Sequence, residues 1–368
     1  MNRDRFPGLA GGWVRLDGPA GTQMVDVAID AMADFMRSGR NANSHGAFAA
    51  ADATDACVAD ARAAVGELFS ADPRGVIFGP SMTALTMRFA RTVIEPGDEV
   101  VLTRLDHDAN VRPWILAGAS VSFADPTEAL ELPAAAVEAV LTDRTKWVCV
   151  TAAANACGSI PDLAGITALA HEAGARVYVD AVHASPHRPL DASQFDVLAC
   201  SAYKWFGPHI GIQCARPELL ESLHPDKLAP SPDEIPDRFE LGTLPFESLA
   251  GVAAAARYVG SLDWSEVRAH EDGLLRRAID GLGDAVTRYG DAADRTSTLM
   301  FNVPGRTSLE VARALAEREI AVWDGNYYAH ELEQHLGLAP DGAIRAGFVH
   351  YNDADDVDRL VDAVTALA

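Results

Sequence analysis

Short apolar runs alternate with longer amphipathic stretches through the middle of the chain. The runs are rich in valine and isoleucine, so we expect strands at 76–79, 99–103, 120–124, 146–151, 176–180, 195–201 and 211–215. Between two of these runs, Leu163, Ile166 and Ala170 recur at helical spacing before Gly174, a residue type that commonly ends helices. Apolar strands that alternate with helices are typical of a parallel sheet covered on both faces. The pattern therefore predicts an α/β, doubly wound architecture with a mainly parallel sheet.

The pattern changes after about residue 224. Residues 224–245 are rich in proline and acidic side chains and follow neither the strand nor the helix period, so we expect a loop. Beyond this loop the periodicity predicts helices near 246–260 and 264–284, a strand at 296–303, a helix that ends near Arg318, a strand at 320–324 and a last helix from Asp355. These elements indicate a smaller α+β domain. We predict a large domain over 16–255 and a small domain made of 1–15 together with 256–368.

Composition limits the kind of partner this chain can have. Its 368 residues are 49% hydrophobic, which is enough for two domains with large cores. No apolar run approaches the length of a membrane span, and the opening residues lack the apolar core of a secretory signal, so we expect a cytoplasmic protein. A formal net charge of -23 repels the phosphates of nucleic acids and of anionic lipids. We therefore expect neither a nucleic-acid partner nor a membrane partner.

The cysteines and histidines do not indicate a disulfide framework or a metal site. Five cysteines, an odd number, form no C-x-x-C pair, and we interpret them as reduced and mostly buried thiols. The eleven histidines are scattered along the chain. His183 and His187 are four residues apart, but the motif described below explains them better than zinc does.

Two polar residues at predicted strand ends have side chains suited to catalysis. Open parallel sheets bind ligands beyond the carboxyl ends of their strands. Asp180 ends one predicted strand, and Lys204, one of three lysines in the chain, follows another in a short turn. A partly desolvated lysine amine can form a Schiff base, and an acid opposite it can keep a pyridine ring protonated as an electron sink. A surface lysine and a helix-capping aspartate remain an alternative interpretation of these two residues.

The sequence around this pair resembles the class V aminotransferase and cysteine desulfurase family. VDAVHASPHRPLD and CSAYKWFGPHIGI are similar to the family segment in which an Asp, a Ser-x-x-Lys and a Gly-Pro turn bind pyridoxal 5'-phosphate (PLP). The resemblance implies a PLP-dependent transferase of fold type I, with catalytic roles for Lys204 as the Schiff-base lysine and Asp180 as the partner of the ring nitrogen. It implies that Ser201 binds the phosphate, that His183 lies beside the phenolic oxygen, and that Tyr203 also contacts the cofactor.

Two upstream segments extend the resemblance. FGPSMTALTMRFA is similar to the family's phosphate cup, in which Ser81 and Met82 would open a helix whose N-terminus faces the phosphate. A serine at a helix start can also be a simple N-cap, so this motif alone leaves both interpretations open. LDHDANVRPW resembles the HHAN-x-x-PW motif. That likeness implies a catalytic His107 stacked on the pyridine ring, with Asn110 and Trp114 in support.

Three later segments resemble the parts of the family that contact substrate and partner. VTAAANACGSIPDL implies that Asn155 contacts the ring oxygen and the substrate, although a turn asparagine would explain it too. RFELGT implies that Thr243 reaches the phosphate of a neighbouring subunit, and hence a homodimer with shared active sites. AIRAGFVHYN implies that Arg345 binds the substrate carboxylate in bidentate fashion, with a surface arginine as the alternative.

The resemblance fails at one loop. Cysteine desulfurases have a loop similar to RTGHHCA, whose cysteine attacks the substrate sulfur, whereas the aligned run here is VWDGNYYAHEL. Tyr328 then takes the place of the cysteine as a substrate contact, and Trp323 replaces an arginine. Cys157 is close in sequence to Asn155, but we interpret it as a packed thiol. A persulfide-forming desulfurase is therefore disfavoured.

The residues together predict a PLP enzyme that acts at the alpha carbon of a small amino acid. We expect a C–S lyase that acts by beta-elimination, or a desulfurase-like activity without the loop cysteine. An aminotransferase or an amino acid epimerase would use the same lysine, and a non-catalytic protein that binds PLP or a partner would have the same fold. A nicotinamide enzyme is disfavoured because no G-x-G-x-x-G follows the first strand.

Overall fold

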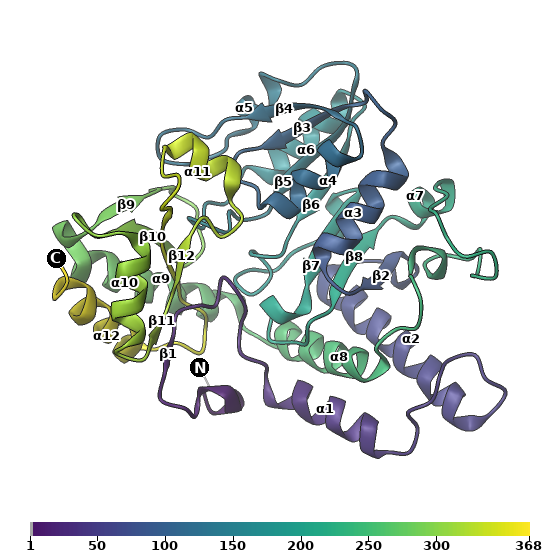
Figure 1. Ribbon diagram of the computed structural model, residues 1–368. Helices are drawn as coiled ribbons and strands as arrows, with labels where there is room; N and C mark the ends of the chain where they lie inside the picture. The colour runs from purple at the N-terminus through teal and green to yellow at the C-terminus, as the bar shows by residue number, and fades with distance from the viewer. Residues whose placement is uncertain (1–2) are drawn as a thin grey trace.

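A seven-stranded sheet forms the centre of the larger part of the molecule. The computed structural model describes residues 3–368 (Figure 1). The strand order is β2-β8-β7-β6-β5-β3-β4. The strands are β2 (Val76–Gly79), β3 (Glu99–Thr103), β4 (Ser120–Ala124), β5 (Thr145–Thr151), β6 (Arg176–Asp180), β7 (Val197–Ser201) and β8 (Gly211–Ala215). Each predicted strand of the middle region is confirmed, with β7 beginning two residues later than predicted.

The sheet is mixed, but most of its strand pairs are parallel. Strands β4, β3, β5, β6 and β7 pair in parallel, while β8 runs antiparallel to both β7 and β2. The connection between β7 and β8 is too short for the crossover that a parallel pair needs, so the chain turns back directly. This turn contains Lys204.

Helices cover both faces of this sheet, as predicted. Neighbouring residues of β2 show the two sides: Val76 and Phe78 pack into one core cluster and Ile77 into another. The first cluster includes residues of α2 (Ala49–Phe69), α6 (Leu163–Glu172) and α8 (Phe246–Gly260), and the second those of α3 (Met82–Val93), α4 (Arg112–Leu116) and α7 (Pro217–Ser222). Helices α1 (Asp26–Arg37) and α5 (Ala134–Glu138) complete this part.

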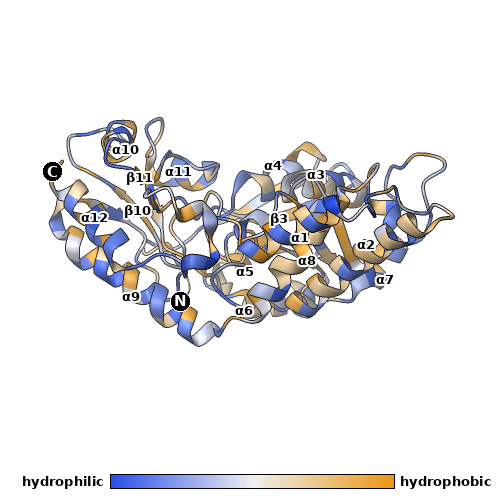
Figure 2. Cartoon of the chain, turned by 90° about the horizontal axis from the view of Figure 1, so that it is seen from below, coloured by the Kyte–Doolittle hydropathy of each residue, from blue (hydrophilic) through white to orange (hydrophobic). Residues whose placement is uncertain are grey.

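A second sheet organises the smaller part of the molecule. It is antiparallel, with the order β12-β13-β10-β9. The strands are β9 (Thr287–Tyr289), β10 (Thr298–Asn302), β12 (Trp323–Gly325) and β13 (Ala343–Gly347), and the helices here are α9 (Trp264–Leu282), α10 (Ser308–Ala316), α11 (His330–Leu336) and α12 (Ala354–Thr365). Leu274, Phe301, Ile344 and Leu360 belong to its separate core. In Figure 2 the ribbons of α9 and α12 carry both hydrophilic and hydrophobic residues, as amphipathic helices should.

The N-terminal segment contacts both parts of the molecule: a short strand pairs with the smaller part, while Phe6 and Leu9 pack into the first core cluster of the larger part. Strand β1 (Val14–Arg15) pairs in parallel with β11 (Ile320–Ala321) in a two-stranded sheet. The single strand predicted at 320–324 is wrong, because the chain changes partner within it: Ile320 pairs with Val14, whereas Trp323 pairs with Arg345 of the four-stranded sheet. The exact domain boundaries stay a prediction. Within residues 3–368, no helix combines the length and the apolar character needed to cross a membrane.

Candidate active site

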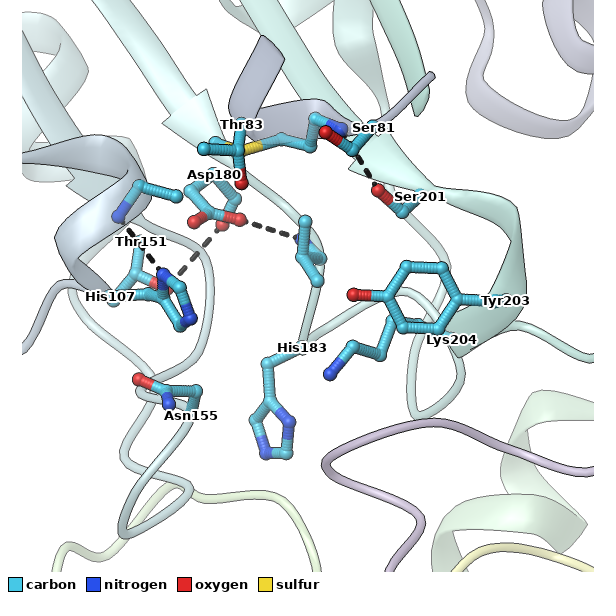
Figure 3. A pocket seen from close by; sticks show the side chains of 13 residues that line it. Ser81, Thr83, His107, Thr151, Asn155, Asp180, His183, Ser201, Tyr203 and Lys204 are labelled. Atoms are coloured by element: carbon cyan, nitrogen blue, oxygen red, sulfur yellow. Dashed lines mark hydrogen bonds between the residues drawn. The ribbon is translucent and has the colours of Figure 1, made fainter. Parts of the chain in front are cut away.

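A hollow lies beyond the carboxyl ends of the central strands. Strands β5, β6 and β7 point their carboxyl ends toward it, and the N-terminus of α3 borders it (Figure 3). Every residue predicted to bind the cofactor, except Thr243, lines this hollow: Ser81, Met82, His107, Asn155, Asp180, His183, Ser201, Tyr203 and Lys204. Parallel strands bring these residues together because their carboxyl ends meet at one edge of the sheet.

Lys204 lies buried in the turn after β7. Its amine donates a hydrogen bond to the carbonyl oxygen of Pro19, and it lies 5.2 Å from the centre of the Tyr203 ring. Burial lowers the pKa of the Lys204 amine to about 7, and the positive charge of Arg345 adds to this shift while Asp180 opposes it. A large fraction of the amine is therefore unprotonated at neutral pH, the state in which it can act as a nucleophile or a base.

Asp180 ends β6 as a buried carboxylate. Its Oδ1 accepts a hydrogen bond from the backbone N–H of Val182 at 2.9 Å. Burial raises the pKa of Asp180 to about 6, against the effects of the Val182 N–H and of Lys204. The carboxylate is thus mostly ionised at neutral pH. A buried negative charge of this kind suits a protonated ring nitrogen.

The first turn of α3 and the end of β7 form a cradle for an anion. The Ser81 hydroxyl caps the helix by accepting from the N–H of Ala84 at 3.2 Å, and the Met82 N–H donates to the Ser201 hydroxyl at 3.1 Å. A Cβ added at Gly211 of β8 would lie 2.2 Å from the carbonyl carbon of Ser81, so the close approach of strand and helix requires glycine there. Hydroxyls at the positive end of a helix fit a phosphate dianion.

His107 presents a neutral ring to the hollow. Burial lowers its pKa to about 3, helped by the charges of Lys204 and Arg345. Its Nδ1 accepts from the backbone N–H of Ala109 at 3.0 Å, which fixes the orientation of the ring. The ring also stacks on Tyr328, with centroids 5.4 Å apart and planes 23° apart. A planar, uncharged ring held in this way can stack on a flat cofactor.

Arg345 lies in an adjoining hollow toward the four-stranded sheet. Four residues line both hollows, namely His107, Asn155, Tyr203 and Lys204, and Tyr328 lines the second. Arg345 is buried on β13, and burial lowers its pKa to about 10, so it stays a cation at neutral pH. Its Nη1 donates to the carbonyl oxygen of Asn155 at 3.0 Å, but its Nε has no hydrogen-bond partner within residues 3–368. A buried cation with a free donor is a suitable site for a carboxylate.

Asn155 also has an unused polar atom. Its Nδ2 donates to the carbonyl oxygen of Tyr327 at 2.9 Å, whereas its buried Oδ1 has no partner in the described part of the chain. Buried polar atoms are nearly always paired, so the atoms left over here and on Arg345 indicate a place for a polar ligand. The donors and acceptors around the hollows therefore fit PLP and an amino acid.

The structure does not bring Thr243 to these hollows. It lines a separate depression with residues such as His45, Arg62 and Phe246. Its predicted contact with a phosphate requires a second copy of the chain and stays a prediction. None of the five cysteines lines either hollow, and Cys157 is buried with its Sγ 3.3 Å from the Ser159 hydroxyl.

Several residues around the site were not predicted from the sequence. Pro19 supplies a backbone carbonyl, which has no sequence signature, from a position 185 residues before Lys204. Tyr327 lies beneath the guanidinium of Arg345, 4.4 Å from ring centre to Cζ. Tyr327 and its neighbour Tyr328, which was predicted as a substrate contact, both adopt the left-handed backbone conformation, with φ of 52° and 61°. That conformation is uncommon for bulky residues, and both tyrosines line the second hollow.

Comparisons with known proteins agree with one another. The family described as Aminotransferase class-V matches residues 14–360. An uncharacterized protein of Mycobacterium tuberculosis, MT3887, is 33% identical over 99% of this chain and 98% of its own length. A probable cysteine desulfurase of Mycobacterium leprae is 31% identical over 96% of this chain, which spans 61% of that protein. The apo structure of a cysteine desulfurase from Thermococcus onnurineus has a TM-score of 0.93 at 24% identity, covering 99% of this chain and 96% of that chain, and shows the same fold.

Proposed function

The chain belongs to the class V aminotransferase family, which includes cysteine desulfurases, and on this premise we propose that it is an enzyme that acts at the alpha carbon of an amino acid. Members of the family use PLP. The observation that carries the proposal is the enclosure of Lys204, with its amine pKa lowered to about 7, in one hollow with Asp180. The predicted fold class and the resemblance to the family are both confirmed.

The residues of the hollow would hold the cofactor as follows. Lys204 would bind its aldehyde carbon, Asp180 its ring nitrogen, and the α3 N-terminus with Ser81 and Ser201 its phosphate. His107 would cover one face of the ring, with His183 and Asn155 near the ring oxygen. When bound, PLP supplies an electron sink for the electron pair released at the alpha carbon.

Three side chains then have separate roles in the reaction of the substrate. Arg345 binds the alpha-carboxylate, which fixes the alpha carbon beside the cofactor site. Lys204 in its unprotonated form takes the alpha proton. Asp180 remains ionised, and its negative charge would stabilise a proton on the ring nitrogen of the bound cofactor. These roles require only groups that line the two adjoining hollows.

For the reaction itself we propose beta-elimination of a small amino acid with sulfur on its beta carbon, as in a C–S lyase or a desulfurase-like enzyme without a loop cysteine. The position of Tyr328 against His107, and the absence of any cysteine from the lining of the hollows, support this choice. An aminotransferase or epimerase would use the same Lys204, and a non-catalytic PLP-binding or partner-binding protein would keep only the fold. Family members are typically dimeric, and in a homodimer Thr243 would reach the phosphate held by the second copy.

Replacing Lys204 tests the proposal directly. The purified protein should be yellow, and borohydride should fix PLP covalently to Lys204. Lys204→Ala should abolish the visible absorption and the turnover, while Lys146→Ala, at an exposed position of β5, should leave both unchanged. Separate assays for pyruvate, ammonia, sulfide and keto acids would then identify the reaction. A persulfide found on any cysteine after turnover would contradict the role given to Tyr328.

A further inference from the structure

His183 connects the hollow to the four-stranded sheet. Its buried ring lines the hollow, where Figure 3 shows it below the other labelled side chains. On its other side, the Nε2 atom lies 2.9 Å from the hydroxyl oxygen of Thr298 and 3.2 Å from that of Thr296. Thr298 is the first residue of β10, so this contact joins the two parts of the molecule. The Nδ1 atom has no hydrogen-bond partner within residues 3–368 and is the one available to a ligand.

The two threonines determine where the proton of the ring must be. The Thr296 hydroxyl donates to the Thr298 oxygen at 3.2 Å, which uses its only proton. The Thr298 hydroxyl can then donate to Nε2 of His183. If Nε2 had the proton instead, it would donate to the Thr298 oxygen, and the proton of the Thr298 hydroxyl would have no acceptor among the described residues. A buried donor without an acceptor is strongly disfavoured.

From this geometry we infer that Thr296 and Thr298 hold His183 as the neutral tautomer with its proton on Nδ1, so that the ring donates a hydrogen bond into the hollow. A donor in that place selects an anionic oxygen on the ligand. Thr298 is then a positioning residue that acts through His183. A strand of the four-stranded sheet therefore helps to set the position of a proton in the cofactor site.

The surroundings of His183 keep its ring neutral. Burial lowers its pKa well below the usual value, and the nearby charges of His187, Arg345 and Lys204 act in the same direction. The His187 ring lies 5.3 Å away and pairs with Glu271 at 2.7 Å. A neutral imidazole has only two tautomers, so the partner of one nitrogen decides the state of the other.

The threonine pair is itself held rigidly. The N–H of Thr296 donates to the carbonyl oxygen of Gly158 at 2.8 Å, and Arg295 donates to the carbonyl oxygen of Thr298 at 2.7 Å. A Cβ added at Gly158 would lie 2.7 Å from the Thr296 hydroxyl. The pair therefore cannot shift to suit the other tautomer without moving the turn that contacts it.

Nitrogen NMR of histidine tests the inference without any cofactor. In the cofactor-free chain labelled with ¹⁵N-histidine, the His183 signals, assigned with His183→Gln, should show a protonated Nδ1 and an unprotonated Nε2. In Thr296→Ala/Thr298→Ala, water admitted to the vacated space can accept from or donate to Nε2, so both tautomers should appear. Thr296→Ser/Thr298→Ser should restore the single tautomer. Thr167→Ala is the matched control, because the Thr167 hydroxyl is buried with no partner in residues 3–368.

A second measurement uses the cofactor and rests on the proposed function. The double alanine variant should bind PLP about three- to tenfold more weakly, since part of its His183 no longer donates into the hollow. The double serine variant and Thr167→Ala should bind as the unmodified chain does. If the unmodified chain binds no PLP, the proposed function is refuted, but the NMR experiment still determines the tautomer of His183. A proton on Nε2 in the unmodified chain, or a double alanine variant that keeps a single Nδ1–H tautomer, would overturn the inference.

Discussion

Individual side chains in this site derive their reactivity chiefly from burial. The first cause of the lowered pKa values of Lys204 and His107, and of the raised pKa of Asp180, is the loss of contact with water. Burial favours the neutral form of each group. The charges of neighbouring residues then adjust these values, and those adjustments can be measured by removing one neighbour at a time.

The rate of PLP uptake should depend on pH through Lys204. Because only the unprotonated amine attacks an aldehyde, uptake by the cofactor-free chain should rise as the pH passes through the Lys204 pKa of about 7. Arg345 lowers this pKa and Asp180 raises it, so Arg345→Gln should move the profile to higher pH and Asp180→Asn to lower pH. Stopped-flow absorbance at a series of pH values measures these shifts. Shifts of the same sign in both variants would contradict the electrostatic account.

Arg345 should govern substrate affinity more than cofactor affinity. Arg345→Lys keeps a positive charge but loses the planar fork, so we expect KM for the amino acid to rise about 10- to 100-fold. The dissociation constant of PLP should change much less. Arg276→Gln, at an exposed position of α9, provides a control that should alter neither constant. Equal losses of substrate and PLP affinity in Arg345→Lys would show that this residue supports the fold of the site instead.

At the scale of elements, the strands of the large sheet were predictable because both of their faces are buried. Continuous apolar runs such as 99–103 and 176–180 therefore stand out from their surroundings. The run 320–324 looked like one strand, but its two halves pair with different sheets. A five-residue sequence contains no signal for such a change of partner. Short elements such as β9 and α11 have too few residues to show a period.

The candidate site, like the fold, could be predicted only where a local sequence pattern marks its residues. Asp180 and Ser201 are the last residues of their strands, Lys204 follows one of these strands, and sequence motifs mark all three directly. The carbonyl of Pro19 and the hydroxyl of Thr298 reach the site from distant segments through backbone or threonine atoms that form no motif. Contacts of this kind depend on how the two sheets pack, which the local sequence does not encode.

Gly211 should be essential for the junction between β8 and α3. A methyl group there would collide with the backbone of Ser81, so Gly211→Ala should lower the free energy of unfolding by about 1–3 kcal/mol and weaken PLP binding. Urea unfolding and PLP titration measure the two effects. Gly273→Ala is a matched control, since that position lies inside α9 with no atom within 4 Å of the added Cβ, and it should stabilise by about 0.5–1 kcal/mol. A Gly211→Ala variant as stable as the unmodified chain would contradict the close approach.

At the scale of the whole molecule, charge should influence stability. A net charge of -23 makes the compact state repel itself, and dissolved salt screens that repulsion. Raising potassium chloride from about 0.02 M to 0.5 M should therefore raise Tm by about 2–5 °C. Calorimetry measures the shift, and an uncharged osmolyte at the same osmolarity separates screening from excluded-solute effects. A Tm that falls with salt would mean that the many surface ion pairs outweigh the repulsion.

The path of the N-terminal segment gives the molecule an order of assembly. Val14 pairs with Ile320, so the partner strand of β1 is made some three hundred residues after β1 itself. The carbonyl of Pro19 reaches the Lys204 amine just beyond β1. During synthesis on the ribosome, the lysine turn therefore emerges long before its carbonyl partner can be locked in place. We therefore expect the cofactor, a form of vitamin B6, to bind only after the last strands of the nascent chain have been synthesised.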